Sequence, residues 1–315
     1  MNISINFETV NLTEKRADEK VSRILALGGF DGIHKGHKKI FSNLLEFSNE
    51  FSSSINSVMT FDELPVQYFS KDIFNNVLIN TLEERLDLLK DCNVDEVIIL
   101  NFSSIKELLP EQFMNWILKD LLNAKAMLFG NDYSFALNKQ GNAQILLDWA
   151  YANNILCKKI ELEYFDEKEK ISSNLIRRFL KSGNLERANE CLGHNFFLYS
   201  KVKTGLKLGR TLGFPTVNCE YPKNKITIPK GVYAGKINGK VGAINFGSAP
   251  TLRDSFEVCV ETHILDSNDV NFKEGDFVKV EFIKFMREEL KFSSINELKL
   301  QIEKDCEMIK IFFNS

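Results

Sequence analysis

The chain has 315 residues, of which 44% are hydrophobic, and this length suits two domains of roughly 150 residues each. Its formal net charge of −3 argues against a general binder of nucleic acids or membrane surfaces. No apolar run approaches the ~20 residues that span a bilayer, and the polar N-terminal segment has no signal-peptide core. The 6 cysteines are scattered without a Cys-x-x-Cys spacing, so we expect reduced thiols and a cytoplasmic location.

Up to about residue 180, the hydrophobic pattern alternates between strands and helices. Apolar runs predict strands at 24–27, 57–61, 97–100 and 126–129. Helical spacing predicts a helix that begins near His34 and His37, and further helices at 81–90, 110–122 and 144–153. This alternation predicts an α/β domain with a parallel sheet covered by helices on both faces, whose ligands bind beyond the carboxyl ends of the strands.

Residues 28–37 read GGFDGIHKGH and directly follow the first of these strands. The paired glycines Gly28 and Gly29 allow a sharp turn and close approach of a ligand. His34 and His37 are three residues apart and share one helix face. Because free backbone N–H groups at a helix start attract anions, the segment predicts a polyphosphate site. The alternatives are a plain connecting turn, or half of a metal site for which no second histidine pair exists.

After about residue 195, short alternating runs are separated by Gly, Pro and Asn turns, which predicts a small antiparallel all-β barrel. The expected strands are 197–203, 215–219, 232–237, 241–246, 258–265 and 278–285. Asn238-Gly239 predicts a hairpin turn. A terminal helix over 295–311 is expected to pack on the barrel through Leu298, Ile302, Met308 and Ile309. A helical connector near 181–194, with few strong apolar anchors, divides the chain into domains at 1–184 and 185–315.

A second candidate site lies at residues 205–218, which read GLKLGRTLGFPTVN. Its glycines loosen the loop, while Lys207 and Arg210 offer positive charge to phosphates. Period-two alternation places Thr216 and Asn218 on one strand face, with Val217 toward the core. A hydroxyl and an amide oxygen side by side suit Mg²⁺ shared with ATP phosphates, but an ordinary hydrogen-bonded turn explains the spacing equally well.

GGFDGIHKGH resembles the Gly-x-Phe-Asp-Gly-x-His-x-Gly-His signature of nucleotidylyl transferases, in the form seen in prokaryotic FAD synthetases. The resemblance implies a Rossmann-like N-terminal domain, in which both histidines contact ATP phosphates and stabilise charge as pyrophosphate departs. Matches at 130–136 and 171–177 extend the implied site. The implied ATP contacts are Gly28, Gly29, Phe30, Asp31, His34, His37, Gly130, Asp132, Ser172, Ser173 and Arg177.

GRTLGFPTVN resembles the Gly-Arg-x-Leu-Gly-Phe-Pro-Thr-x-Asn signature of riboflavin kinases, which implies that Thr216 and Asn218 hold the metal and that Glu261 is the general base. Alternation places Glu261 and His263 away from the core, although a lone strand glutamate is more often simply solvated. The implied kinase ATP contacts are Gly205, Lys207, Gly209, Arg210, Thr216 and Asn218. The implied flavin contacts are Gly213, Phe214, Pro215, Arg287 and Phe292.

The order of the two signatures resembles the bifunctional prokaryotic riboflavin kinase/FAD synthetase. This family implies phosphorylation of riboflavin to FMN and adenylylation of FMN to FAD, with ATP as co-substrate and Mg²⁺ as cofactor. Leu64, Ala136 and Asn174 depart from the family pattern, where His, Gly and Thr are usual, and residues 270–275 replace a Leu-Tyr-Gly turn. They leave open a kinase whose N-terminal domain is inactive. A flavin- or nucleotide-binding regulatory protein without enzymatic activity is a second alternative, against which the retained Glu261 counts. We expect no nucleic-acid or membrane partner.

Overall fold

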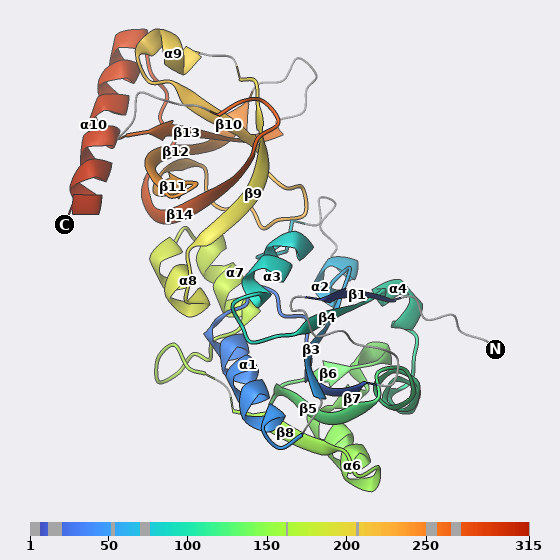
Figure 1. Cartoon of the computed structure of the whole chain (residues 1–315). Helices are drawn as coiled ribbons and strands as arrows, with labels where there is room; N and C mark the ends of the chain where they lie inside the picture. The colour runs from blue at the N-terminus through green and yellow to red at the C-terminus, as the bar shows by residue number, and fades with distance from the viewer. Residues whose placement is uncertain are drawn as a thin grey trace. The chain divides into compact units, whose positions relative to one another are not determined.

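The computed structural model describes residues 7–11, 21–51, 54–69, 76–161, 163–205, 208–249, 257–265 and 272–314. Contacts divide the chain into two compact units, both drawn in Figure 1. The first unit contains residues 1–73 and 80–173, and the second contains residues 74–79 and 174–315. The short segment 74–79 joins the second unit through a parallel bridge between Leu78 and Lys225.

The first unit is built on a six-stranded sheet in the order β1-β4-β3-β2-β5-β8. All neighbouring strands pair in parallel except β1, which is antiparallel to β4. The bounds are β1 Phe7–Asn11, β2 Ser22–Leu27, β3 Ser54–Phe61, β4 Glu96–Leu100, β5 Ala124–Gly130 and β8 Leu156–Ile160. The predicted parallel sheet is confirmed. The apolar pattern misses β1, which lies in a polar segment, and β8, which is half exposed along most of its length.

The sheet separates two apolar cores, because alternate residues of each strand face opposite sides. On one side, α1 (Lys35–Ser48) and α3 (Leu82–Leu89) cover Ile24 and Ala26 of β2. On the other side, Leu25 and Leu27 meet residues of α6 (Ala143–Ala152) and of η1 (Phe113–Leu121). The helix α1, drawn in blue in Figure 1, contacts β2 and β5.

One helical region differs in detail from the prediction. The expected helix over 110–122 is a short α5 (Pro110–Gln112) that continues into the π-helix η1. In its last turn, the N–H of Leu122 bonds to the carbonyl of Ile117, five residues back. The remaining short elements of this unit are α2 Pro65–Tyr68, α4 Phe102–Ile105, β6 Ser134–Phe135, η2 Leu137–Lys139 and β7 Gly141–Asn142.

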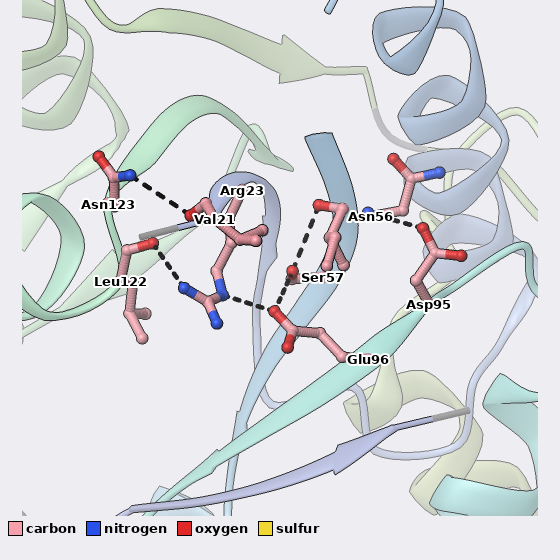
Figure 2. A network of polar contacts seen from close by, with 9 residues as sticks. Val21, Arg23, Asn56, Ser57, Asp95, Glu96, Leu122 and Asn123 are labelled. Atoms are coloured by element: carbon pink, nitrogen blue, oxygen red, sulfur yellow. Dashed lines mark hydrogen bonds and ion pairs between the residues drawn. The ribbon is translucent and has the colours of Figure 1, made fainter. Parts of the chain in front are cut away.

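A buried polar network ties three parallel strands together near their amino ends (Figure 2). The Arg23 Nε on β2 donates to the Glu96 carboxylate on β4 at 2.5 Å, and the Ser57 hydroxyl on β3 donates to the same oxygen at 2.6 Å. Glu96 is fully buried and Arg23 is 7% exposed. The network lies at the end of the sheet opposite the switch point, which favours a role in stability over one in ligand binding.

The second unit contains a closed barrel in the order β10-β13-β12-β11-β14-β9, with every neighbouring pair antiparallel. Its strands are β9 Phe196–Lys203, β10 Thr216–Glu220, β11 Gly231–Ile237, β12 Lys240–Ala249, β13 Glu257–Ile264 and β14 Phe277–Glu288. All six predicted strands are confirmed. The hairpin turn at Asn238-Gly239 is also confirmed, with φ of 46° and 80° at its two residues.

Three shorter helices flank the barrel strands in sequence: α7 Ser173–Lys181, α8 Leu185–Leu192 and α9 Leu208–Leu212. The expectation that the connector has few apolar anchors is wrong, because α8 buries Leu185, Ala188, Cys191 and Leu192. Among the described residues, no helix is long and apolar enough to cross a membrane.

The terminal helix α10 (Ile295–Asn314) packs on β12, and Figure 1 shows it along the barrel. Its buried residues are Asp305, Cys306 and Ile309. The prediction that Met308 packs on the barrel is wrong, since its side chain is 43% exposed. A buried carboxylate fills part of the interface instead, because Asp305 accepts hydrogen bonds from Arg287 on β14 at 2.9 and 2.6 Å.

Candidate functional site

The GGFDGIHKGH loop lies at the switch point of the sheet. Strand order reverses between β2 and β5, so the loop after β2 and the turn at Gly130–Asp132 after β5 emerge at the same edge. Both segments therefore lie beyond the carboxyl ends of the strands, where ligands of such sheets bind. The helix α1 begins immediately after His34, so its amino end faces the same region.

His34 and His37 stack against each other, with ring centroids 3.5 Å apart and planes inclined by 21°. His34 is the N-cap of α1, and its Nδ1 accepts a hydrogen bond from the backbone N–H of His37 at 3.3 Å. Because Nδ1 acts as an acceptor, the neutral ring carries its proton on Nε2. His34 therefore presents an Nε2–H donor.

His37 is held neutral by its surroundings. Burial, with His34 beside it, keeps the pKa of His37 well below its ordinary value. Its Nδ1 is buried and has no hydrogen-bond partner among the described residues. The Phe30 ring meets the His37 ring edge-on at 5.1 Å. The two rings together therefore form a stacked pair of imidazoles that can donate hydrogen bonds to phosphate oxygens.

The backbone conformation of the loop differs from the expectation that Gly28 and Gly29 supply its turn. Positive φ occurs instead at Phe30 (50°), Gly32 (93°) and Ile33 (39°). The paired glycines leave little room for a side chain, because a Cβ on Gly28 would lie 3.0 Å from the Phe30 ring and one on Gly29 would lie 3.3 Å from Leu64.

Two other predicted segments contact this loop or its neighbours. The Ser173 hydroxyl donates to the carbonyl oxygen of Asp31 at 2.8 Å, so the start of α7 is fastened to the loop. The Asp31 carboxylate accepts from the N–H of Asn80 at 3.0 Å. Asp132, beyond β5, forms an ion pair with Lys170 at 3.0 Å, and both side chains are well exposed.

The remaining residues predicted for this site lie on α7 or just before it. Ser172 is half-buried and directly precedes the helix. Arg177 belongs to the second unit, where its Nε donates to the carbonyl of Val77 at 2.7 Å and its NH1 donates to the Asn174 side chain at 2.8 Å. These bonds hold Arg177 through protein groups, so a role toward ATP stays a prediction.

On the barrel, the predicted kinase residues gather on the outer face of β10 and β13. Thr216 pairs with His263, and Asn218 pairs with Glu261. Val217, Val260 and Ile264 are buried on the inner side, which confirms the predicted alternation. Thr216, Asn218 and Glu261 are half-buried, and burial raises the pKa of the Glu261 carboxyl. Glu261 is therefore a more basic group than a solvated strand glutamate.

The amide of Asn218 is held between two neighbours. Its Nδ2 donates to the Thr216 hydroxyl at 3.3 Å, while the Cys259 thiol donates to its Oδ1 at 3.8 Å and to the Glu261 carboxylate at 4.0 Å. Burial raises the pKa of the Cys259 thiol to about 11, so it stays protonated. Sequence reasoning missed Cys259, although its position two residues before Glu261 puts it on the same strand face.

A cavity of about 230 Å³ opens beside these residues. Its lining comes from β9, β10, the loops that flank them and the segment before β14: Val202, Lys203, Thr204, Gly205, Pro215, Thr216, Val217, Asn218, Phe272 and Glu274. Gly205 backs directly on the site, since a Cβ there would lie 2.5 Å from the Asn218 amide. Gly209 is equally confined, with the Phe214 carbonyl oxygen 2.4 Å from a Cβ position. Lys207 and the side chain of Arg210 lie outside the described residues.

The predicted flavin residues fall into two groups. Gly213 (φ 92°), Phe214 and Pro215 directly precede β10, and His263 contacts both the Phe214 ring at 5.3 Å and the Pro215 carbonyl at 2.9 Å. Arg287 lies elsewhere on the barrel, where Asp305 binds its guanidinium. Phe292 is half-buried in the segment between β14 and α10. The structure thus joins the first group to the kinase face, while the role of Arg287 and Phe292 toward flavin stays a prediction.

Comparisons with known proteins agree with both sites. The family model for FAD synthetase matches residues 16–175, and the model for riboflavin kinase matches residues 192–313. A bifunctional riboflavin kinase/FMN adenylyltransferase from Haemophilus influenzae is 33% identical over 92% of this chain and 94% of its own. A protein of the same name from Bacillus subtilis is 31% identical over 98% of this chain and 99% of its own.

The chain belongs to this bifunctional family. It is an enzyme with an FMN adenylyltransferase domain and a riboflavin kinase domain, which favours the bifunctional hypothesis over a kinase alone. A crystal structure described as a macrolide-efflux protein from Streptococcus pneumoniae shares the fold, with a TM-score of 0.82 and 28% identity. The likeness covers 95% of this chain and 97% of that one.

Proposed function

We propose that the outer face of β10 and β13 is where the enzyme phosphorylates riboflavin, with Glu261 as the general base. The carboxylate would take the proton from the ribityl 5′-hydroxyl as that oxygen attacks the γ-phosphorus of ATP, giving FMN. The observation that carries this assignment is the pairing of Glu261 with Asn218, beside a cavity lined by Thr216 and Gly205. Burial makes the carboxylate a stronger base in this position.

Mg²⁺ is the cation that suits this face. The donors are a hydroxyl on Thr216 and an amide oxygen on Asn218, and no cluster of three or more His, Cys, Asp or Glu able to hold a metal occurs within the described residues. Such a sparse set of hard oxygen donors fits an ion that keeps waters and shares substrate phosphates. For both oxygens to face one cation, the Asn218 amide must rotate, because its Nδ2 now faces Thr216. When bound, the cation neutralises charge on the phosphates.

In the first unit, we propose that a phosphate oxygen of FMN attacks the α-phosphorus of ATP, so that FAD forms and pyrophosphate leaves. His34 donates from Nε2 to a phosphate oxygen, and His37, stacked on it, stabilises charge on the leaving pyrophosphate. The backbone of Gly28, Gly29 and Asp31 forms the loop against which the ATP phosphates would bind. The bond from Ser173 to Asp31 supports a role of the α7 start in closing this site.

We further propose that the functional domains divide near residues 184 and 185, between α7 and α8. The family matches end at residue 175 and resume at residue 192, which is compatible with this division. ATP serves as co-substrate in both reactions. The proposed location is the cytoplasm, where thiols remain reduced, and all six cysteines are free thiols in the structure.

The test is a time course of purified enzyme with riboflavin, ATP and Mg²⁺, in which the flavins are separated by chromatography. Glu261→Gln should abolish FMN formation from riboflavin and leave conversion of supplied FMN to FAD intact. His37→Asn should do the reverse. Glu281→Gln is the matched control, because Glu281 is also a half-buried, outward-facing glutamate of the barrel, on β14. Loss of both activities from either single change, in a folded protein, would refute the division of labour.

A further inference from the structure

Arg85 is a fully buried arginine beneath the GGFDGIHKGH loop. It belongs to α3 and is 1% exposed. Its NH1 donates to the carbonyl of Gly29 at 2.9 Å and to the Thr60 hydroxyl at 2.8 Å, and its NH2 donates to the carbonyl of Phe61 at 3.1 Å. One guanidinium thus joins the loop after β2 to the end of β3.

Removing the Arg85 cation from water costs free energy, and its contacts in the folded protein do not offset this cost completely. Desolvation lowers the pKa of Arg85 to about 10, against the attraction of Asp31 and Asp62, so it stays charged near neutral pH. Its Nε is buried without a hydrogen-bond partner among the described residues. An apolar side chain of similar volume would often serve stability as well or better, so the guanidinium calls for another explanation.

The bonds from Arg85 determine the direction of one peptide group in the loop. The Gly29 carbonyl oxygen also accepts from the Thr60 hydroxyl at 3.1 Å, so two donors occupy its two lone pairs. The peptide between Gly29 and Phe30 is trans, so the N–H of Phe30 points away from that carbonyl. Within the described part of the chain, this N–H has no hydrogen-bond partner. In this peptide group, the Gly29 carbonyl oxygen thus has both of its hydrogen bonds, while the Phe30 N–H is available to a ligand.

The loop would not keep this conformation unaided. Phe30 has φ of 50°, and the β-branched Ile33 has φ of 39°, a region that such residues rarely adopt. Strained backbone of this kind persists only where the surroundings determine it, and it concentrates at functional sites. Phe30 and Ile33 are both buried, and the Arg85 and Thr60 bonds hold the peptide that enters the strained stretch.

We propose that Arg85 is a positioning residue for adenylyl transfer, which keeps the Gly29–Phe30 peptide turned so that the Phe30 N–H meets an oxygen of the ATP triphosphate. Arg85 itself does not touch the nucleotide, because it is only 1% exposed and its bonds go to Gly29, Thr60 and Phe61. Thr60 acts with it as the second donor to Gly29. This inference rests on the proposed assignment of the loop as the ATP phosphate site.

The test uses the full-length enzyme and measures kcat and KM for ATP in FMN adenylylation, with riboflavin phosphorylation as an internal reference. Arg85→Met should lower kcat/KM for ATP by about 10- to 100-fold, because a charged donor to the loop is lost. Arg85→Lys, which keeps one charged donor, should recover part of that loss. KM for FMN and the kinase reaction should not change.

A second pair of variants separates positioning from mere stability. Thr60→Val keeps the shape but removes the hydroxyl, whereas Thr60→Ser keeps the hydroxyl. We expect Thr60→Val to lower kcat/KM for ATP several-fold relative to Thr60→Ser even when tryptophan fluorescence shows both proteins folded. This pair decides the question if Arg85→Met fails to fold. Unchanged ATP kinetics in folded Arg85→Met, or equal kinetics in the Thr60 pair, would overturn the proposal. Absence of FAD formation in the unmodified enzyme would instead refute the proposed function.

Discussion

Replacing Ala136 with glycine should stabilise the first unit. Ala136 has φ of 65° and ψ of −176°, a backbone region that is essentially reserved for glycine. The methyl group crowds the backbone there, and such residues carry about 1–3 kcal/mol of strain. The family pattern has glycine at this position, so the substitution restores the residue that the conformation favours.

The expected size follows from three opposing contributions. Relief of strain contributes about 2 kcal/mol. Greater freedom of glycine in the unfolded chain costs about 0.4–1 kcal/mol. Ala136 is only partly buried against the core formed by Phe135 and its neighbours, so loss of its methyl costs less than the ~0.8 kcal/mol of a fully buried one. The net gain in the free energy of unfolding is about 1 kcal/mol.

Urea unfolding followed by tryptophan fluorescence measures this gain selectively, since both tryptophans, Trp116 and Trp149, lie in the first unit. With a denaturant slope of about 2 kcal/mol/M, the urea midpoint should rise by about 0.5 M. The control is Ala126→Gly in the middle of β5, where the same chemical change should lower the midpoint. A midpoint that falls in Ala136→Gly as it does in Ala126→Gly would refute the strain argument.

The remaining predictions use the same enzyme. Glu96→Ala should lower the free energy of unfolding by about 3–5 kcal/mol, because it leaves the Arg23 guanidinium buried without its carboxylate. The double variant Arg23→Met/Glu96→Leu removes both charges and should leave the free energy of unfolding unchanged or raised. Equal losses in the two variants, measured by urea unfolding, would contradict this. The rate of riboflavin phosphorylation should fall as the pH is lowered, with an apparent pKa above the ordinary ~4.3 of a glutamate. The reason is that burial raises the pKa of Glu261 and that a general base acts only when it is deprotonated. An apparent pKa at or below ~4.3 would refute the role of Glu261. Burial lowers the pKa of His37 in the folded protein, so below about pH 6.5 the unfolded chain takes up a proton that the folded chain does not. The contribution of His37 to the free energy of unfolding should therefore be constant above that pH and fall below it by up to ~1.4 kcal/mol per pH unit. The urea assay should show a shallower fall in His37→Asn, and an equal pH dependence in the two proteins would contradict this.

Much of the fold was predictable because its signals are local in the sequence. Four of the five parallel strands and all six barrel strands follow from apolar periodicity, and two histidines three residues apart meet on one helix face. Period two also placed Thr216 and Asn218 on one face of β10 and Glu261 on the facing strand. These patterns depend on neighbours within a few residues, so a single sequence contains them.

The parts that could not be predicted depend on contacts between distant segments. A hydrophobicity pattern treats Arg85 as a solvated helix residue, yet it is buried because Gly29, Thr60 and Phe61 offer it acceptors 24–56 residues away in sequence. Arg287 is similar, since its partner Asp305 lies 18 residues further along the chain. Charged residues become internal only where the tertiary fold supplies partners, and the sequence pattern does not reveal those partners.

The three departures from the family pattern affect the support of the adenylyltransferase site more than its reacting groups. Leu64 is buried and packs beneath Gly29, where an apolar side chain fills the space without a polar partner. Asn174 accepts a hydrogen bond from Arg177, so the side chain that replaces the hydroxyl still orients that arginine. Neither change displaces the stacked histidines. Ala136 alone carries an energetic cost, and that cost is conformational. We therefore expect this chain to form FAD, and any weakness in that reaction to be relieved by stabilising the loop that contains Ala136.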